Sequence, residues 1–343
     1  MAEKVVTISS SQRSCAPLNG SSCAPIWSVG DWSAHVVATT CMVSHTLKYE
    51  LAMLKVAAAV ALLGLNHSAQ RQSQQPPLML DIGANCGIYT MLFGANGYRC
   101  TPVEPLPTCI LHIRRSIELN RFGERVDVQQ HGASDVEATF EVPVGTCSPY
   151  YGLGHSERLH TNEKSYTTAV PARVFVPNHL DAPWFVKIDT EAHEAKVLAS
   201  LAPLLRRRRI AYLFFELSPH NWFQANVTRE WGYAALQDAL DAPGYKSYLF
   251  AMGEGDRVMC KRMAHTRHGD ACAHLRLPKE PEADGSHFGL RAIQQLLHSQ
   301  APVYGLPLGV ANAVNTSWGR TSFGMNVLSV APVGSPVWSA YSL

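Results

Sequence analysis

Short apolar stretches alternate with longer amphipathic stretches through residues 78–250. Short apolar runs bounded by turn residues are typical of buried strands, and apolar positions spaced three and four apart are typical of helices that cover a sheet. The predicted strands are 78–82, 99–103, 126–130, 184–188, 211–217 and 246–250, and the predicted helices are 87–95, 108–120, 191–205 and 230–240. This alternation predicts an α/β fold built around a largely parallel sheet.

The segments that flank this alternation have other patterns. Residues 1–45 are rich in Ser, Cys, Ala and Thr without sustained periodicity, which predicts a loosely ordered leader or cap. Residues 46–66 are dominated by Leu, Ala, Met and Lys and predict a helical extension. We further expect a hairpin extension at 140–144, an inserted loop at 147–168, a second insertion at about 253–322 and a final strand at about 326–330. Together these features indicate a single domain over residues 46–343 with its core at 78–250.

Composition limits the class of protein. The 343 residues are 46% hydrophobic and 16% charged, which supplies a sizeable core and excludes a disordered, solvating chain. The formal net charge of +2 is too close to balance for a large nucleic-acid surface, because phosphate binding requires clustered Lys and Arg. We therefore expect a small-molecule or glycan partner and no nucleic acid.

Nine cysteines are scattered from Cys15 to Cys272, and their odd number excludes a fully paired disulfide framework. We expect reduced, mostly buried thiols. Residues 260–274 gather cysteines and histidines, which are zinc-ligand types, but the segment lacks the paired C-x-x-C spacing of structural zinc sites. The sequence therefore predicts no metal in this segment.

Two features bear on the compartment. The N-terminal segment has no continuous apolar core after Lys4, so it does not resemble a secretory signal. The most apolar run, 51–65, contains Lys55 and is about 15 residues long, shorter than the ~20 that cross a bilayer, so it predicts a buried helix and no membrane span. We expect a cytoplasmic protein. Four Asn-x-Ser/Thr sequons keep a secretory route or the Golgi lumen open as the alternative.

The most informative segment joins a predicted strand to a predicted helix through a glycine-rich turn. The strand ends near Asp81, and Gly83, Asn85 and Gly87 follow before the helix. Glycine allows close approach of a ligand to the backbone, and free amides at a helix start receive anionic groups. The turn matches neither the G-x-G-x-x-G dinucleotide pattern nor a P-loop, which argues against a nicotinamide-dependent oxidoreductase. Glu104 ends the next strand about 20 residues later, where a carboxylate can accept both hydroxyls of a ribose.

Four motifs follow one another along the chain: D-I-G-A-N-C-G at 81–87, V-E-P at 103–105, K-I-D-T-E-A-H-E at 187–194 and F-F-E-L at 214–217. Over roughly residues 78–250 the chain resembles the FkbM family of S-adenosylmethionine-dependent methyltransferases, whose motifs have this order. The chain departs from the family pattern at Val103, where the family has Phe, and at Ala192, where the family has Gly. The two expected insertions are unmatched.

This resemblance implies a doubly wound, Rossmann-like methyltransferase sheet of seven strands, mostly parallel, with S-adenosylmethionine across the carboxyl ends of the first strands. The resemblance implies that Gly83, Asn85 and Gly87 line the methionine portion, that Glu104 binds the ribose and that Ser134 or Asp135 lies at the adenine edge; Asp81 is a further predicted cofactor-binding residue.

The segment 187–194 supplies the predicted catalytic residues. The resemblance places Asp189 beside the transferred methyl group, where it would orient or deprotonate an acceptor hydroxyl, and His193 has the better intrinsic pKa for a base. Glu194 is expected to offset the dipole of the following helix. We predict no metal, with a divalent ion bound by Asp189 and Glu216 as the alternative.

These residues predict an S-adenosylmethionine-dependent O-methyltransferase that acts on a hydroxyl of a small molecule or sugar. The alternative is a catalytically silent Rossmann-like module that keeps the cofactor fold for binding or assembly. Ala192 favours the alternative, because its methyl group narrows the helix entrance beside the predicted site. The complete set of turn residues with Glu104 favours the enzyme.

Overall fold

The computed structural model describes residues 26–29, 32–37, 54, 56–58, 60–61, 64–65, 75–143, 147, 164–176, 182–219, 221–250, 325–332 and 335–337. The predicted insertion at 253–322, with the cysteines and histidines of 260–274, lies outside these residues. Most of the predicted loop at 147–168 also lies outside them. The single domain over residues 46–343 therefore stays a prediction.

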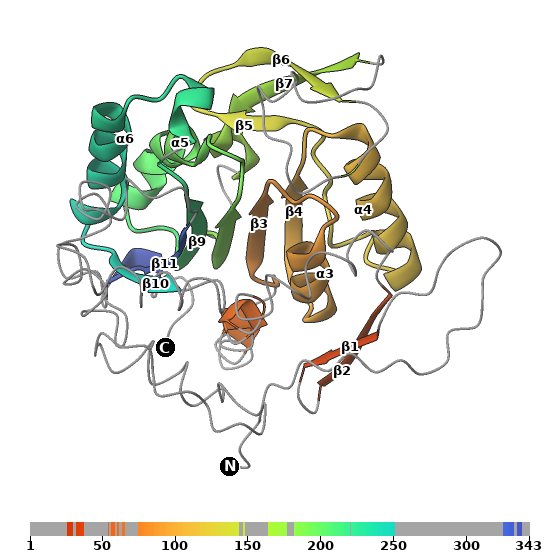
Figure 1. Cartoon of the computed structure of the whole chain (residues 1–343). Helices are drawn as coiled ribbons and strands as arrows, with labels where there is room; N and C mark the ends of the chain where they lie inside the picture. Colours follow the sequence, from red (N-terminus) through yellow and green to blue (C-terminus); the bar gives the residue numbers. More distant parts are fainter. Residues whose placement is uncertain are drawn as a thin grey trace, which may run out of the picture.

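A six-stranded sheet forms the centre of the described part of the chain (Figure 1). Its strands, in spatial order, are β10 (Lys246–Phe250), β11 (Met325–Val330), β9 (Tyr212–Leu217), β8 (Phe185–Ile188), β3 (Leu78–Ile82) and β4 (Arg99–Val103). The four strands from β9 to β4 pair in parallel, whereas β11 runs antiparallel to both of its neighbours. The predicted α/β fold around a mostly parallel sheet is confirmed. β3 and β8 are buried along their whole length, as expected for strands covered on both faces.

Residues 126–130 were expected to form a strand, and the structure differs from this prediction. This segment runs parallel beside β4 but makes only two isolated bridges with it. The N–H groups of Cys100 and Glu104 donate to carbonyls of this segment, at 2.8 and 3.0 Å. Pro102 lies between these two donors and has no N–H, so the ladder lacks the bond that would make the pairing continuous. The seven strands implied by the resemblance therefore appear as six in the described residues.

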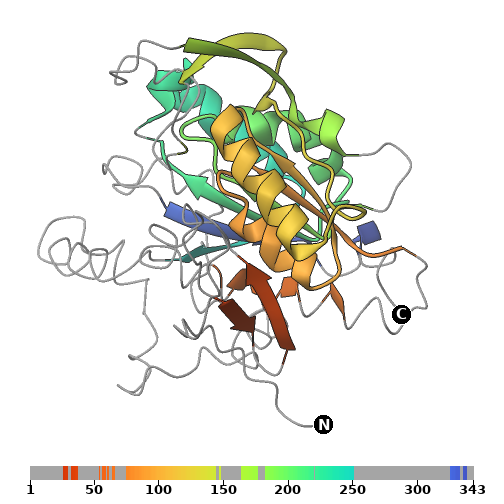
Figure 2. The ribbon, with the colours of Figure 1, turned by 90° about the vertical axis from the view of Figure 1, so that its right-hand side faces the viewer.

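Helices cover both faces of the central sheet (Figures 1 and 2). The helices are α3 (Ile88–Ala95), α4 (Pro107–Asn120), α5 (Glu194–Arg206) and α6 (Arg229–Leu236), and the short turns are η2 (Ala172–Phe175), η3 (Trp222–Ala225) and η4 (Gln237–Asp241). The chain moves from β3 to β4 in one direction across the sheet and from β8 to β9 in the other, so right-handed crossovers place α3 and α5 on opposite faces. In agreement, α3 packs on α4, and α5 packs on α6. The strand order reverses between β3 and β8, where open α/β sheets bind ligands.

A three-stranded sheet lies beyond the carboxyl ends of the central strands (Figure 1). It contains, in spatial order, β5 (Gly132–Ser134), β7 (Lys164–Pro171) and β6 (Ala138–Pro143). β6 and β7 pair antiparallel, which confirms the predicted hairpin extension. However, β7 begins within the stretch expected to be an inserted loop. Its Ser and Thr residues appear polar in sequence, yet Thr and Tyr favour a strand once a partner strand is present.

Two further segments appear below the central sheet in the view of Figure 1. β1 (Ile26–Val29) and β2 (Trp32–Val37) form an antiparallel hairpin within the leader that was expected to be loosely ordered, and β2 contacts α3 and α4. Their Val, Ile and Trp residues favour strands. The described residues of 54–65 are helical, and all but Leu65 are buried, which confirms a buried helix there. No helix among the described residues has the length and apolar character of a membrane span.

Candidate functional site

The turn after β3 is shaped by three residues in the left-handed region. Gly83 has φ 72°, Asn85 has φ 50° and Gly87 has φ 81°. A Cβ atom on Gly83 would lie 1.7 Å from the backbone oxygen of Asp189, so only glycine allows the turn to approach the end of β8 this closely. The predicted turn thus lies at the reversal point of the sheet, with the end of β8 directly beside it.

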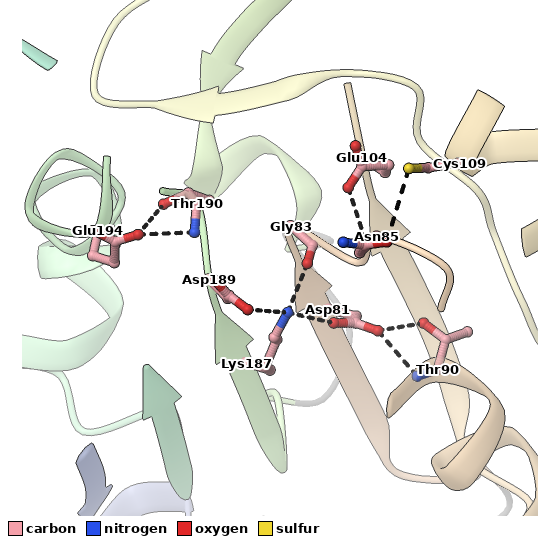
Figure 3. Close-up of polar contacts among 10 residues, drawn as sticks. All are labelled: Asp81, Gly83, Asn85, Thr90, Glu104, Cys109, Lys187, Asp189, Thr190 and Glu194. Atoms are coloured by element: carbon pink, nitrogen blue, oxygen red, sulfur yellow. Dashed lines mark hydrogen bonds and ion pairs between the residues drawn. The ribbon is translucent and has the colours of Figure 1, made fainter. Parts of the chain in front are cut away.

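Glu104, which directly follows β4, ties the turn to the neighbouring strand (Figure 3). Its Oε2 atom accepts a hydrogen bond from Asn85 N at 2.8 Å, and its Oε1 atom accepts one from Leu106 N at 3.0 Å. The side chain is 5% exposed, and burial raises its pKa to about 7, although both backbone donors oppose this shift. The structure therefore brings Glu104 and the turn together, as the sequence predicts.

Asp81 is fully buried at the end of β3 and supports the start of α3. Its Oδ2 atom accepts hydrogen bonds from the N–H and the hydroxyl of Thr90, at 3.0 and 2.6 Å. Its Oδ1 atom has no hydrogen-bond partner among the described residues. Burial raises the pKa of Asp81, whereas the charge of Lys187 and the bonds from Thr90 lower it.

The segment after β8 contains the predicted catalytic residues. Asp189 lies at the strand end with its side chain 33% exposed, and Lys187 Nζ is 3.3 Å from its Oδ2 atom. His193 directly precedes α5 and is 1% exposed, with its ring edge-on to Phe140 of β6 at a centroid distance of 5.6 Å. Asp189 is therefore the more accessible of the two predicted catalytic groups.

Backbone geometry between these two residues is unusual. Glu191 and Ala192 both lie in the left-handed region, with φ 50° and φ 86°, and this conformation favours glycine. Glu194, in the first turn of α5, accepts at Oε1 hydrogen bonds from Thr190 N at 2.8 Å and from the Thr190 hydroxyl at 3.1 Å, and its predicted interaction with the helix dipole stays a prediction.

Three carboxylates could hold a cation at this edge of the sheet. Asp189, Glu191 and Glu216 each place one oxygen within 4.8 Å of the others. Burial, followed by the negative charges of Asp189 and Glu216, raises the pKa of Glu191 to about 9. A proton on Glu191 thus relieves the repulsion near neutral pH without a cation, and the predicted absence of a metal stays a prediction.

The two residues proposed for the adenine edge come from the other sheet. Ser134 ends β5 and is buried, and its hydroxyl donates to Asp135 Oδ1 at 3.1 Å. β5 follows the segment that runs beside β4, so both residues lie beyond Glu104 along this edge. Their contact with an adenine ring stays a prediction.

Sulfur atoms surround the Asn85 side chain. Cys109, in the first turn of α4, forms a disulfide with Cys147, whose Sγ atom lies 3.2 Å from Asn85 Oδ1 and 3.4 Å from the Sγ atom of Cys86. Cys86 is also in a disulfide, whereas Cys100 is buried and free. The prediction of reduced thiols is therefore wrong for three of these four cysteines. An odd number excludes complete pairing but not partial pairing, and the fold brings together two sulfurs 38 positions apart.

Lys187 is a functional candidate for which the sequence analysis predicted no role. It is 4% exposed, and its Nζ atom donates to Gly83 O at 2.6 Å. The available signal was its spacing from Asp189, because residues two apart in a strand project from the same face. No role follows from that spacing alone, since the contact with the turn depends on strands distant in sequence.

Comparisons with known proteins give similarity to solved structures only, because no family model and no curated protein matches the chain. A precorrin-6y C5,15-methyltransferase from Geobacter metallireducens is 14% identical, with a TM-score of 0.28 over 55% of this chain and 74% of its own. The METTL16 methyltransferase domain is 13% identical, with a TM-score of 0.33 over 57% of this chain and 62% of its own. The bifunctional kinase-methyltransferase WbdD is 11% identical, with a TM-score of 0.34 over 59% of this chain and 35% of its own. This chain thus spans less than two thirds of the length of the last two.

The fold and the site define an α/β protein with an open, mostly parallel sheet and a glycine-rich turn at the point where the strand order reverses, which is where such sheets bind ligands. This assignment rests on strand order and on the contacts of the turn. Membership of the FkbM family stays a prediction that the four motifs carry.

Proposed function

We propose that this protein is an S-adenosylmethionine-dependent methyltransferase that methylates a hydroxyl group of a small molecule or glycan. The observation that carries the proposal is the hydrogen bond from Asn85 N to Glu104 Oε2 at 2.8 Å. It joins the glycine-rich turn to a strand-end carboxylate at the reversal point of the sheet. This combination fits a nucleoside ligand, because a carboxylate can accept its ribose hydroxyls and a glycine-rich turn allows close backbone approach to its polar tail.

The polar atoms of the site fit the chemistry of the cofactor. Glu104 uses each oxygen for one backbone N–H and keeps further lone pairs for ribose hydroxyls. Asp81 Oδ1 is buried without a hydrogen-bond partner in the described part of the chain, and a ligand ammonium group would supply one. We assign Gly83, Asn85 and Gly87 to the methionine portion and keep Ser134 or Asp135 for the adenine edge.

Bound S-adenosylmethionine would supply an electrophilic methyl group on a sulfonium: an O–CH₃ bond would form as the CH₃–S bond breaks, with S-adenosylhomocysteine as the leaving group and the hydroxyl proton passing to a base. The protein then has to align the acceptor and remove its proton. Asp189 is suited to this task, because its carboxylate is one third exposed at the strand end next to the turn. His193 has the more suitable intrinsic pKa but lies buried against Phe140, so we propose Asp189 as the residue that contacts the hydroxyl.

Calorimetry with S-adenosylhomocysteine tests the cofactor assignment. Glu104→Ala should weaken binding by about 1–3 kcal/mol, since it removes the acceptor of the ribose hydroxyls. Glu118→Ala is the matched control, because Glu118 is an exposed carboxylate on α4 that pairs with Arg115. Wild-type protein that does not bind S-adenosylhomocysteine would contradict the proposal, and so would equal affinity in the wild type and Glu104→Ala.

Methyl transfer separates the enzyme from a silent binding module. Protein with methyl-labelled S-adenosylmethionine is offered a panel of small hydroxyl compounds and glycans, and labelled product supports the enzyme. With an accepted substrate, Asp189→Asn should lower turnover by about 10²–10⁴ and leave the affinity for S-adenosylhomocysteine nearly unchanged. A large loss only in His193→Gln would instead assign the base to His193.

A further inference from the structure

We propose that Lys187 is a positioning residue that holds the cofactor turn in register with Asp189. This inference rests on the proposed function, but its central contacts are made between residues of the chain itself. One ammonium group joins the turn after β3 to the carboxylate after β8 (Figure 3).

The strand register brings Lys187 to this place. In the parallel pairing of β3 with β8, Lys187 lies opposite Asp81. Asp189 follows two residues later, and side chains two apart in a strand share a face. Lys187 therefore projects among the groups at the carboxyl ends of both strands, where it is 4% exposed.

Among the described residues, the ammonium contacts groups from four parts of the site. Its Nζ atom donates to Gly83 O at 2.6 Å, lies 3.3 Å from Asp189 Oδ2 and lies 3.9 Å from Asp81 Oδ1. It also lies 5.4 Å from the ring centroid of Tyr89, in the first turn of α3, where a cation–π contact is favourable. The cation thus touches the end of β3, the turn, the start of α3 and the end of β8.

Stability alone is a weak reason for a charge at this position. Removing an ammonium from water costs several kcal/mol, and buried ion pairs often stabilise a fold no more than apolar residues of similar size. What the ammonium adds is direction. It contacts one oxygen of Asp189, Oδ2, and so orients the carboxylate plane from one side, while its bond to Gly83 sets the distance of the turn from that carboxylate.

Alignment is the property that this arrangement protects. The turn would bind the methyl donor and Asp189 would hold the acceptor, so the in-line geometry depends on their relative position. A displacement of about 1 Å costs as much as 10² in rate in oriented reactions. Because Lys187 contacts both partners, its loss should affect the chemical step more than cofactor binding.

The first experiment needs no acceptor. Hydrogen exchange is measured on the wild type and Lys187→Met, which replaces the ammonium with an uncharged chain of similar length. Lys196→Met, on the partly exposed face of α5, is the matched control. We expect the amides of residues 83–87 to exchange at least tenfold faster in Lys187→Met only, with those of β9 unchanged. Unchanged exchange in the turn would overturn the proposal.

A second variant covers the case in which Lys187→Met does not fold. The double variant Asp81→Asn/Lys187→Met removes both members of the buried Lys187–Asp81 pair, and the amide oxygen of Asn still accepts from Thr90. It lacks the ammonium that contacts Gly83, so the turn should again exchange faster than in Asp81→Asn alone. Equal exchange in these two variants would overturn the proposal.

The catalytic experiment uses S-adenosylhomocysteine and an acceptor found in the panel. We expect Lys187→Met to bind S-adenosylhomocysteine within about tenfold of the wild type and to lose about 10² in kcat with little change in acceptor KM. In an Asp189→Asn background the same substitution should cost little more, because its partner is gone. Additive losses would overturn the proposal, and so would a loss confined to cofactor affinity. A wild type that does not bind S-adenosylhomocysteine would contradict the proposed function instead.

Discussion

On the proposed function, the affinity for S-adenosylhomocysteine should fall as the pH is lowered from 8 to 6, because the ionised form of Glu104 would accept the ribose hydroxyls. The carboxyl group is 5% exposed, and burial raises its pKa to about 7. Its two backbone donors, Asn85 N and Leu106 N, favour ionisation but do not offset burial. Ribose hydroxyls would add two more donors to the ionised form, so binding and proton release are linked.

The pKa sets the size of this effect. With a pKa of about 7, roughly 90% of the Glu104 carboxyl groups are ionised at pH 8 and roughly 10% at pH 6. If the ionised form binds and the protonated form does not, the apparent Kd is the intrinsic value divided by the ionised fraction. The Kd should therefore rise about tenfold between pH 8 and pH 6.

Calorimetry at pH 6, 7 and 8 on three proteins tests this linkage. In Glu104→Gln the amide does not titrate, so binding should be weaker than in the wild type at pH 8 and nearly independent of pH. Glu194→Gln is the matched control, because burial also raises the pKa of Glu194 to about 7, while its carboxylate bonds to Thr190 at the start of α5. A flat wild-type profile would refute the reasoning, as would a wild-type slope in Glu104→Gln.

Three further predictions concern stability. Gly83→Ala should lower the free energy of unfolding by at least about 2 kcal/mol, because the new Cβ atom would lie 1.7 Å from a backbone oxygen, and it should abolish detectable binding of S-adenosylhomocysteine. Gly123→Ala, whose Cβ atom would have no neighbour within 4 Å, should be nearly neutral in the same urea titrations. Cys109→Ala/Cys147→Ala opens a loop of 38 positions and should cost about 3–4 kcal/mol, so an unchanged urea midpoint would contradict a stabilising disulfide. Burial raises the pKa of Glu191 from 4.5 to about 9, so its stabilising contribution is complete below pH 4.5 and is lost as the pH rises through about 9. The Tm of the ligand-free wild type should therefore fall between pH 6 and pH 9 more steeply than that of Glu191→Gln.

The sheet was predictable where burial dominates the sequence pattern. The strands expected at 78–82, 99–103 and 246–250 coincide with β3, β4 and β10, and those at 184–188 and 211–217 differ from β8 and β9 by one residue at the start. The parallel strands β3, β8 and β9 are short, mostly apolar runs, and glycine or proline lies near the ends of each expected strand. Such signals are local, so one sequence is sufficient to find them.

Features that depend on a distant partner were not predictable. The segment 126–130 has alternating valines, which suits a strand, yet Pro102 in the adjacent strand removes one bond of the ladder. Conversely, β7 consists largely of polar and aromatic residues and becomes a strand through pairing with β5 and β6. In both cases a neighbouring strand decides whether the segment becomes a strand. The hydrophobic period of the segment itself carries no information about that neighbour.

The candidate site divides in the same way. The turn and Glu104 were predictable together, because the carboxyl ends of adjacent parallel strands share one edge of the sheet. The burial of His193 was not, because it depends on two consecutive left-handed residues, Glu191 and Ala192, and on Phe140 from the smaller sheet. Neither non-glycine residue signals a left-handed backbone in the sequence.

Ala192 is the departure that favours a silent module, and its surroundings weaken that argument. An L-residue at φ 86° costs roughly 1–2 kcal/mol relative to glycine. Burial of the methyl group offsets about 0.8 kcal/mol of this cost, so a net penalty of at most about 1 kcal/mol remains, which is small against the stability of a folded domain. Since the side chain is 0% exposed, this methyl group does not narrow an entrance open to a ligand. The choice between an enzyme and a silent module therefore depends on whether Asp189 and Lys187 handle the proton and the alignment, which the variants of these two residues measure directly.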